Sequence, residues 1–491
     1  MLKTKNVLAK IIILIAAAIS VFTLFGIALS LEFETSFRPK LFAYYGVILL
    51  TAVFFCTISI KWKMKPVYVC IFLFLLSFVF PFIYGRLAFV IGESDLQFYL
   101  SNARYIFRNS PRFDPKYSAT FPGTVTYPVI LTGLFNIFSY CKIIPRVLNQ
   151  VAMSAIVILI YFYLKDKFGS AAAVISAALI STHPFIIVYT NTVNAELLYF
   201  ACILGAYIFT HFADKRCSSD GNVLHFILPA LVLGMSTLFR PLGIILLIAI
   251  VLYYLFFSEF NIKKSAVIVL IFTVSLIMFN ALCGVIVKQV TAFDAPKSAY
   301  GWNLYVGASE SGGWNRADGA EFLEVQERAE TPTEIQEYFA EKAFDRYKDI
   351  GTDVFSRYVK KLSLWNGITY ISRFAESITK ESILSGVFKK EEHALIVSYY
   401  CMASLVLSAL AAILFCRNFF KKTGTVPIIL LLYITGSFVV LSLLEMSKRY
   451  SVSYFLIFAF LSIEVVLSVL KQGVPWLRKK LDERKSEQAK A

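Results

Sequence analysis

Ionisable side chains that border apolar segments are the residues of this chain that could carry chemistry. They are Glu93, Asp95, Arg104, His183, Glu196, Arg240, Glu445, Lys448 and Arg449. An ionisable group in or beside a bilayer is expensive to bury, so each is a candidate functional residue. All are expected on one side of a membrane, where carboxylates and cations would share a pocket. Such a pocket suits a reaction in which an acceptor hydroxyl loses a proton while a departing phosphate is stabilised.

Asp95 is the first of these candidates, because it lies shortly after an apolar segment and begins a predicted helix over 95–108. At the amino end of a helix, the unpaired N–H groups and the helix dipole favour an ionised carboxylate. The same position also suits a purely structural role, in which Asp95 or Ser94 caps the helix. Glu93 is either a second acidic group of the site or an interfacial charge.

Arg240 and Pro241 lie where two apolar helices are predicted to reverse direction. In one interpretation the proline starts the next helix and the arginine reaches the lipid headgroups. In the other, the guanidinium is buried in the pocket and offers a planar fork to a phosphate. The pattern leaves both open.

The last predicted turn on this side carries Glu445, Lys448 and Arg449. The two cations either bind an anionic headgroup or lie at the membrane interface. His183 and Glu196 are single groups in another turn on the same side, and a histidine such as His183 more often ends a helix than binds a ligand.

The composition indicates which elements must position these side chains. Hydrophobic residues make up 58% of the chain, charged residues only 16%, and the mean hydropathy is +0.68. Repeated apolar runs are long enough to cross a bilayer, so we predict an all-α polytopic membrane protein with about twelve transmembrane helices. They are expected at 11–31, 41–60, 66–91, 144–164, 170–188, 194–212, 223–239, 241–257, 265–287, 393–417, 425–445 and 449–471.

The net charge of +16 comes from basic residues in short loops between these segments. This distribution is typical of orientation in a bilayer and does not indicate a nucleic-acid partner. It places both termini in the cytoplasm and the candidate pocket on the outer face. The short apolar segment 124–140 would reverse the later loops if it crossed, so we interpret it as a re-entrant or interfacial helix.

Four regions follow from this topology. Residues 1–287 form an N-terminal transmembrane domain whose first outer loop, 92–143, holds the catalytic candidates. Residues 288–392 form a small, mainly helical outer domain, residues 393–471 form the C-terminal transmembrane helices, and residues 472–491 form a basic cytoplasmic tail.

Aromatic residues of the outer region could bind a sugar, since an aromatic ring pairs with apolar C–H groups. The candidates for sugar or acceptor binding are Tyr99, Trp302, Asn303 and Trp314. Packing in the core of the outer domain explains the tryptophans equally well. One face of its helical part, with Phe339, Ala343, Phe344 and Tyr347, is predicted to pack on the membrane domain.

The sequence identifies no cofactor. The eight cysteines form no CxxC pair or disulfide framework, and HExxH, Walker and GxGxxG motifs are absent. No metal ligands are predicted, and a requirement for a divalent metal is left open.

In order and spacing, several motifs resemble the GT-C superfamily of membrane glycosyltransferases, which includes protein O-mannosyltransferases and enzymes similar to the aminoarabinose transferases of lipid A. The resemblance is carried by residues 93–99, 127–138, 146–149, 165–169, 183–185, 194–196, 234–241 and 445–450.

The resemblance implies a polyprenyl-phosphate-linked sugar as donor and transfer with inversion to an extracytoplasmic glycan, lipid or protein. Asp95 matches the acidic residue of the first outer loop, which would act as general base on the acceptor hydroxyl. Arg240, Lys448 and Arg449, together with Arg104, would bind the donor phosphate.

Two other classes of function remain open. A multi-span transporter or lipid-linked saccharide flippase would also have about twelve spans, although no half-to-half repeat is visible. A non-catalytic assembly protein could use the outer domain to bind glycans. The residue usage favours a bacterial plasma membrane.

Overall fold

The structure is a computed structural model of the chain of 491 residues. It describes residues 54, 56–59, 61–87, 95–183, 187, 189–296, 300–310, 312–353, 356–358, 361, 428–446, 454, 456–457, 459–461, 463–464 and 466–468, with the side chains of 87, 95–97 and 352 left undescribed. The expected spans at 11–31 and 393–417 and the tail 472–491 lie outside these residues.

The described elements are helices. The α-helices are α3 (Pro66–Leu87), α4 (Asp95–Phe107), α5 (Pro115–Thr120), α6 (Gly123–Phe138), α7 (Ile144–Phe168), α8 (Ser170–Ser181), α10 (Glu196–Asp220), α11 (Ile227–Met235), α12 (Gly243–Phe256), α13 (Ile262–Thr291), α14 (Gly301–Gly307), α15 (Arg316–Arg328), α16 (Pro332–Ile350) and α20 (Ile428–Leu443). Short 3-10 turns are η1 (Val223–Phe226), η2 (Ser236–Leu238) and η3 (Gly351–Asp353).

Within this part of the chain, four helices are long and apolar enough to cross a membrane: Pro66–Arg86, Ile144–Phe168, Glu196–Asp220 and Ile262–Thr291. Shorter apolar helices, among them α8, α12 and α20, pack beside them. The predicted all-α polytopic membrane fold is therefore confirmed, whereas the number of twelve spans is not settled by the described helices.

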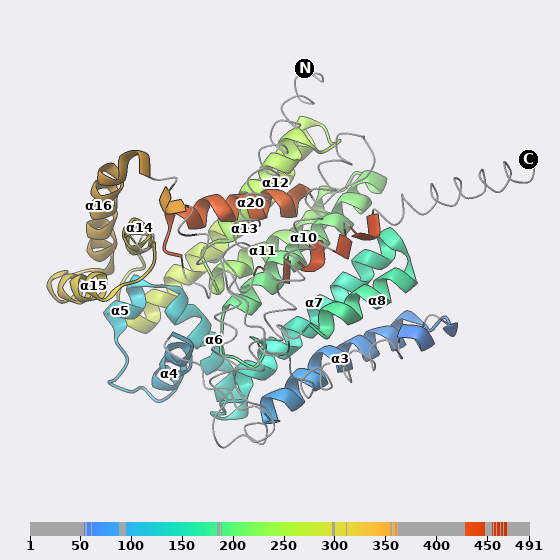
Figure 1. The fold of residues 1–491 in the computed structure, drawn as a ribbon, viewed down its shortest axis with the longest axis horizontal. Coiled ribbons are helices and arrows are strands. Elements are labelled where there is room, and N and C mark those ends of the chain that lie inside the picture. The colour runs from blue at the N-terminus through green and yellow to red at the C-terminus, as the bar shows by residue number, and fades with distance from the viewer. Residues whose placement is uncertain are drawn as a thin grey trace, which may run out of the picture.

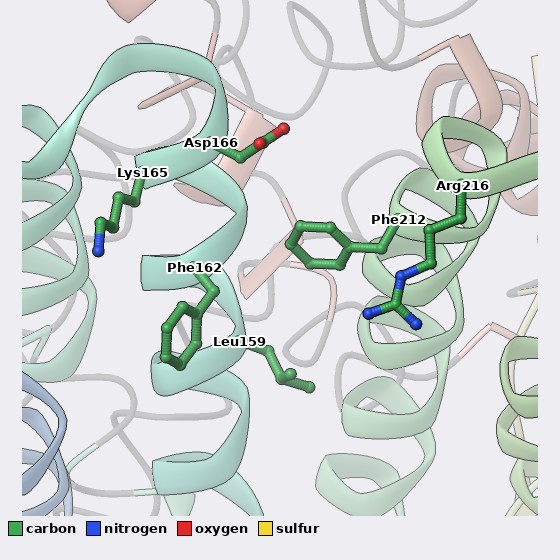
Figure 2. Close-up of a pocket in the computed structure, with 6 residues that line it drawn as sticks. All are labelled: Leu159, Phe162, Lys165, Asp166, Phe212 and Arg216. Carbon is green, nitrogen blue, oxygen red and sulfur yellow. The ribbon is translucent and has the colours of Figure 1, made fainter. Parts of the chain in front are cut away.

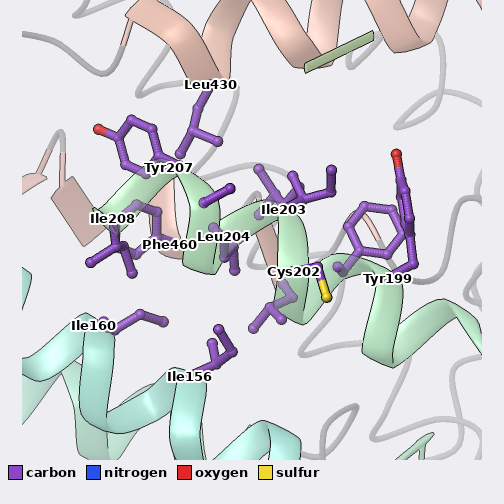
Figure 3. Packing of buried hydrophobic residues seen from close by; sticks show 14 of the residues in the cluster. Ile156, Ile160, Tyr199, Cys202, Ile203, Leu204, Tyr207, Ile208, Leu430 and Phe460 are labelled. Carbon is purple, nitrogen blue, oxygen red and sulfur yellow. The ribbon is translucent and has the colours of Figure 1, made fainter. Parts of the chain in front are cut away.

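Helix α10 is the centre of the bundle. In the apolar 18-residue stretch of each long helix, the buried share is 78% for α10 and 28% for α13. Figure 3 shows Ile203 and Leu204 of α10 between Ile156 and Ile160 of α7 on one side and Leu430 of α20 on the other. A helix that is apolar on all faces is expected at such a position.

Contacts between neighbouring spans use small residues and hydroxyl groups. The Ser275 hydroxyl of α13 donates to the carbonyl of Ala230 in α11 over 2.8 Å. A Cβ on Gly234 of α11 would collide with Ser275 and Phe279. Because lipid chains are as apolar as the helices, close approach and interhelical hydrogen bonds stabilise such a bundle more than hydrophobic burial does.

Helices α14, α15 and α16, here called the loop domain, lie at one end of the bundle together with α4, α5 and α6 (Figure 1). The loop domain has its own core, which includes Trp302, Tyr305, Phe322 and Phe339. Residues Ala329–Thr331 separate α15 from α16.

This break has a local cause. The Thr331 hydroxyl accepts a hydrogen bond from the Glu334 N–H, and the Glu334 carboxylate accepts one from the Glu330 N–H. These reciprocal bonds, with Pro332 in the first turn, start a new helix.

The predicted packing face of α16 is only partly correct. Phe339 and Ala343 pack inside the loop domain, and Phe344 is 66% exposed. Tyr347 does reach the membrane helices, where its hydroxyl donates to the carbonyl of Leu443 in α20. The apolar face of α16 is therefore used mainly against α14 and α15.

Helix α6 begins and ends at the loop-domain end of the bundle. Near its start, the Thr126 hydroxyl donates to the carbonyl of Leu238 over 2.5 Å. Near its end, the ring of Phe135 contacts Tyr140, just before α7 begins. The interfacial interpretation of segment 124–140 stays a prediction.

A buried ionic group lies at the opposite end of the bundle. The carboxylate of Glu464, which is 0% exposed, accepts hydrogen bonds from the Lys167 ammonium and, over 2.7 Å, from the Tyr163 hydroxyl. The hydroxyl of Tyr207 lies 2.7 Å from that of Tyr163. These bonds join the helical residues around Glu464 to the end of α7 and to α10.

Candidate active site

Glu196 and Arg240, predicted as separate candidates, form an ion pair. Glu196 is the first residue of α10 and is 3% exposed, and its carboxylate accepts a hydrogen bond from the Arg240 guanidinium. Arg240 follows η2, and its N–H donates to the carbonyl of Ser236 over 3.0 Å. The pair thus joins the start of α10 to the end of the α11–η2 segment.

The turn before Glu196 is held by side-chain amides. Asn191 donates to the carbonyl of Pro81 in α3 over 2.8 Å, and Gln150 of α7 donates to the Asn191 side chain over 3.0 Å. The Asn194 side chain accepts a hydrogen bond of 2.9 Å from the N–H of Leu197 in the first turn of α10. This bond satisfies a helix-terminal donor, so the position of Glu196 is fixed from several sides.

A cavity of about 70 Å³ lies beside the ion pair. It is lined by Glu196, Tyr199, Phe200, Arg240, Pro241, Leu242, Tyr300, Asn303, Leu441, Leu444, Glu445 and Tyr454. The lining comes from α10, from the residues just before α12, from α14 and its preceding residue, from the end of α20, and from Tyr454. Three residues predicted from the sequence as separate pocket or phosphate-binding candidates, Glu196, Arg240 and Glu445, therefore meet at one place, with the predicted sugar-binding residue Asn303.

The loop domain closes one side of this cavity through hydrogen bonds to the membrane segments. The Tyr300 hydroxyl donates to the carbonyl of Pro241 over 2.8 Å, and the N–H of Glu445 donates to the carbonyl of Asn303 over 2.6 Å. Burial raises the pKa of Tyr300 to about 12, so its hydroxyl remains a donor at neutral pH.

Lys361 supports the wall that α20 contributes. It is 3% exposed, and its ammonium donates to the carbonyls of Ser442 over 2.7 Å and Leu444 over 3.1 Å. A cation is favourable there because the last carbonyls of a helix have no partner within the helix. Burial lowers the pKa of Lys361 to about 8, Arg357 lowers it further, and Glu445 raises it.

Asp95 is the first residue of α4, as the sequence predicted a helix start there. One turn later, Tyr99 is buried and its ring contacts Tyr127 of α6, which in turn contacts Phe239. Phe239 directly precedes Arg240 in the chain. The start of α4 is therefore linked to the ion pair by a series of ring contacts.

The neighbouring residue in α4 faces the loop domain. The ring of Phe98 contacts Tyr117 of α5, and Tyr117 contacts Phe322 of α15. The first turn of α4 thus lies between the loop domain and the segment that carries Arg240.

Other predicted residues have different surroundings. Glu93, Lys448 and Arg449 lie outside the described residues. Arg104 is exposed, with its guanidinium over the ring of Tyr140 at 5.8 Å, and it does not line the cavity. His183 follows the end of α8, and its N–H donates to the carbonyl of Ile180 over 3.1 Å.

The two tryptophans differ in exposure. Trp302 is in the core of the loop domain, which is the packing alternative, and its ring contacts Phe322 and Phe339. Trp314 is 59% exposed. Two tyrosines of the cavity, Tyr199 and Tyr454, were not predicted, because a tyrosine within an apolar run does not differ in pattern from a core residue.

In the described part of the chain, no three His, Cys, Asp or Glu side chains gather in a way that could hold a metal ion.

The fold and this site define a polytopic all-α membrane protein with a charged cavity between its spans and a helical loop domain. Residues 124–283 match the model of a family described as dolichyl-phosphate-mannose-protein mannosyltransferase. The matched stretch runs from α6 into α13 and contains both Glu196 and Arg240. The resemblance to the GT-C superfamily of membrane glycosyltransferases is thereby confirmed.

No curated protein matches the chain in sequence. Among solved structures, the chain is similar to the crystal structure of the Archaeoglobus fulgidus oligosaccharyltransferase in the apo form, with 14% sequence identity and a TM-score of 0.48. The similarity covers 87% of this chain and 52% of that protein, so the chain spans about half the length of the oligosaccharyltransferase.

Proposed function

We propose that the chain is a membrane glycosyltransferase that moves a sugar from a polyprenyl-phosphate donor to a glycan, lipid or protein acceptor. The observation that carries this proposal is the Glu196–Arg240 ion pair beside a cavity that spans and loop domain share. The matched family region contains both residues of the pair. A lipid-linked donor needs such a place, where its tail stays among the spans while its sugar meets a polar acceptor.

Arg240 binds the donor phosphate in this proposal. A planar guanidinium can donate two parallel hydrogen bonds to phosphate oxygens, and Glu196 fixes the orientation of that guanidinium. Lys448 and Arg449, which follow the cavity residue Glu445 in the chain, also bind the phosphate in this proposal. These cations stabilise the charge that builds up on the departing phosphate.

Asp95 acts as the general base. Its carboxylate takes the proton of the acceptor hydroxyl, the acceptor oxygen bonds to the anomeric carbon, and the bond from that carbon to the phosphate oxygen breaks. The products are the glycosylated acceptor, with inverted configuration, and the polyprenyl phosphate. The position of Asp95 at the amino end of α4 supports this role, because a helix N-terminus favours the ionised carboxylate. Glu93 is the second acidic group.

The loop-domain end faces the outside of a bacterial plasma membrane in this proposal. The support is the basic character of the opposite end, where Lys165 and Lys167 end α7 and Lys215 and Arg216 lie near the end of α10. Lysine and arginine concentrate on the cytoplasmic side of membrane proteins. The acceptor then approaches from outside, over the loop domain with its exposed Trp314.

The test is a transfer assay with the purified chain in lipid, polyprenyl-phosphate-linked sugars and a panel of envelope acceptors. We predict that Asp95→Asn abolishes transfer, because the amide is nearly isosteric with the acid but cannot take the proton. The expected loss is at least about a hundredfold, within the usual contribution of a positioned base. Thermal unfolding of the variant should equal that of the wild type.

Asp114→Asn is the matched control. Asp114 lies in the same predicted loop and caps α5 by accepting from the N–H of Tyr117, and asparagine caps a helix equally well. This variant should keep full transfer. Full transfer by Asp95→Asn would show that Asp95 is not the general base. Movement of lipid-linked sugar across the vesicle membrane without transfer would show that the protein is a flippase and not a glycosyltransferase.

A further inference from the structure

A second hollow lies at the end of the bundle opposite to the loop domain. It is a groove of about 610 Å³ between α7 and α10, within the range of volumes found for ligand sites. Its lining residues are Leu159, Phe162, Lys165, Asp166, Phe212 and Arg216. Figure 2 shows that α7 contributes the first four and α10 the last two.

The groove combines an apolar floor with a charged rim. Leu159, Phe162 and Phe212 form the floor, and the side chain of Phe162 is 39% exposed. The charged residues follow within one turn, towards the ends of the two helices (Figure 2). An apolar wall that continues into cations over one turn corresponds to the boundary between acyl chains and headgroups in a leaflet.

The one carboxylate of the rim is already neutralised. Asp166 lies 2.5 Å from the Lys215 ammonium and 3.2 Å from the His211 ring nitrogen. These contacts leave the positive charges of Lys165 and Arg216 to determine what the groove attracts.

Both cations lack a carboxylate partner within the part of the chain that the structure describes. Lys165 lies over the ring of Tyr161 at 5.8 Å, and Arg216 is exposed, with its guanidinium beside Phe212. Figure 2 places the two cations on opposite sides of the floor. The groove thus has two separated positive groups beside one apolar surface.

We propose that this groove binds an anionic phospholipid of the surrounding leaflet. The acyl chains lie on Leu159, Phe162 and Phe212, and the headgroup accepts hydrogen bonds from Arg216 and is attracted electrostatically by Lys165. This lipid is not the sugar donor, because about twenty residues of α10, or about 30 Å, separate Arg216 from Glu196 at the cavity. The occupant is a lipid rather than a free anion because half of the lining is apolar and lies on membrane-spanning helices.

The test measures lipid binding to the purified full chain by native mass spectrometry, with phosphatidylglycerol compared to phosphatidylcholine. Phosphatidylglycerol should remain bound to the wild type and phosphatidylcholine should not. Each of Lys165→Gln and Arg216→Gln should weaken phosphatidylglycerol binding about fivefold, and the double variant about thirtyfold. Lys263→Gln is the matched control, since Lys263 is an exposed cation at the start of α13, outside the groove, and it should change nothing.

A photoreactive benzoylphenylalanine in place of Phe162 locates the lipid. In nanodiscs that contain both lipids, it should crosslink phosphatidylglycerol in preference to phosphatidylcholine, and the double substitution should remove this preference. Equal crosslinking of the two lipids, or an equal loss of binding in Lys263→Gln, would show that the attraction is diffuse and would overturn the proposal.

Discussion

The carboxylate of Glu196 and the guanidinium of Arg240 belong to segments that are 44 residues apart. Both are largely buried, with 4% and 20% of their side chains exposed. A buried ion pair contributes little net stability, whereas removal of one partner leaves the other charge in an apolar environment. The pair therefore has two separable properties, which are its stability as a pair and the capacity of Arg240 to bind a phosphate.

Arg240→Gln should lower the free energy of unfolding by about 3 kcal/mol, since it removes the guanidinium opposite Glu196. The double variant Glu196→Gln/Arg240→Gln should recover most of that loss. Thermal unfolding in detergent measures the stability, and titration with polyprenyl phosphate measures the binding. Binding that stays weak while stability recovers is expected if Arg240 holds the phosphate. If both stability and phosphate binding recover in the double variant, the ion pair has only a structural role.

Lys361 should give the chain a measurable dependence of stability on pH. Its pKa of about 8 in the folded state lies below the ordinary 10.5, so between these values the unfolded chain binds more protons than the folded chain. The free energy of unfolding must then increase as the pH is raised through this window. Burial is the main cause, and Arg357 and Glu445 are the neighbouring charges.

We expect the midpoint of thermal unfolding of the wild type to increase, relative to Lys361→Met, between about pH 8 and about pH 10.5. The difference reports this ammonium, because all other titrating groups are common to the two proteins. Parallel pH profiles for the two proteins would show that the Lys361 ammonium does not cause the pH dependence of stability.

At the scale of elements, α14 touches the end of α20 very closely. A Cβ on Gly307 would collide with the main chain of Leu443 and Leu444. Main-chain atoms cannot move aside as a flexible side chain can, so any larger residue must separate the two helices. The cavity wall formed by Asn303 and Glu445 depends on the same contact.

Gly307→Ala should therefore destabilise the attachment of the loop domain by about 1–3 kcal/mol and reduce transfer. Its control is Gly284→Ala in α13, where no atom lies within 4 Å of the added Cβ. Limited proteolysis of the loop domain and thermal unfolding measure the effect. Equal protease resistance in the two variants would mean that α14 does not need this close approach.

The sequence predicted the helices well within apolar segments, and less well at the helix ends, where the residues become polar. The span expected at 194–212 is present as α10, but the helix continues to Asp220 through polar residues. It stops at Gly221, whose φ of +76° places it in the left-handed region and whose N–H donates to the carbonyl of Cys217 over 2.8 Å. Hydropathy marks the bilayer part of a helix, whereas its true end depends on the cap.

The site was predicted as separate candidates rather than as an assembly. Glu196 and Arg240 stand out locally, because charges are rare in apolar segments. Their pairing depends on contacts between distant segments, which no local pattern contains. Lys361 had no signal at all, since a lysine in a charged region resembles a solvated one until the carbonyls of α20 surround it. Trp302 could not be assigned, because core packing and sugar stacking require the same residue type.

For the whole molecule, the two ends of the bundle carry different ionic groups. Glu196 and Arg240 lie at the loop-domain end, whereas Glu464 and Lys167 lie at the other. The second pair joins the helical residues around Glu464 to α7, and the same segment carries Tyr454 to the cavity. Stability and transfer can therefore be perturbed from opposite ends.

Lys167→Met should lower the free energy of unfolding by about 3–5 kcal/mol, because it leaves the buried Glu464 carboxylate without its cation. Lys167→Met/Glu464→Leu should restore most of this stability. The measurement is thermal unfolding, with transfer rates taken well below the transition, where both variants should equal the wild type. A transfer defect that persists in the stable double variant would assign this end a direct part in the reaction.

The cavity wall also has a consequence for biosynthesis. Leu441, Leu444, Glu445 and Tyr454 line the cavity and follow every other lining residue in the chain. When a ribosome has translated the first four hundred residues, α10, α12 and the loop domain have been synthesised. The side of the cavity formed by Leu441, Leu444, Glu445 and Tyr454 has not. The nascent protein should pass through the insertion machinery without a complete donor site, and it should bind lipid-linked sugar only after α20 and Tyr454 have entered the bilayer.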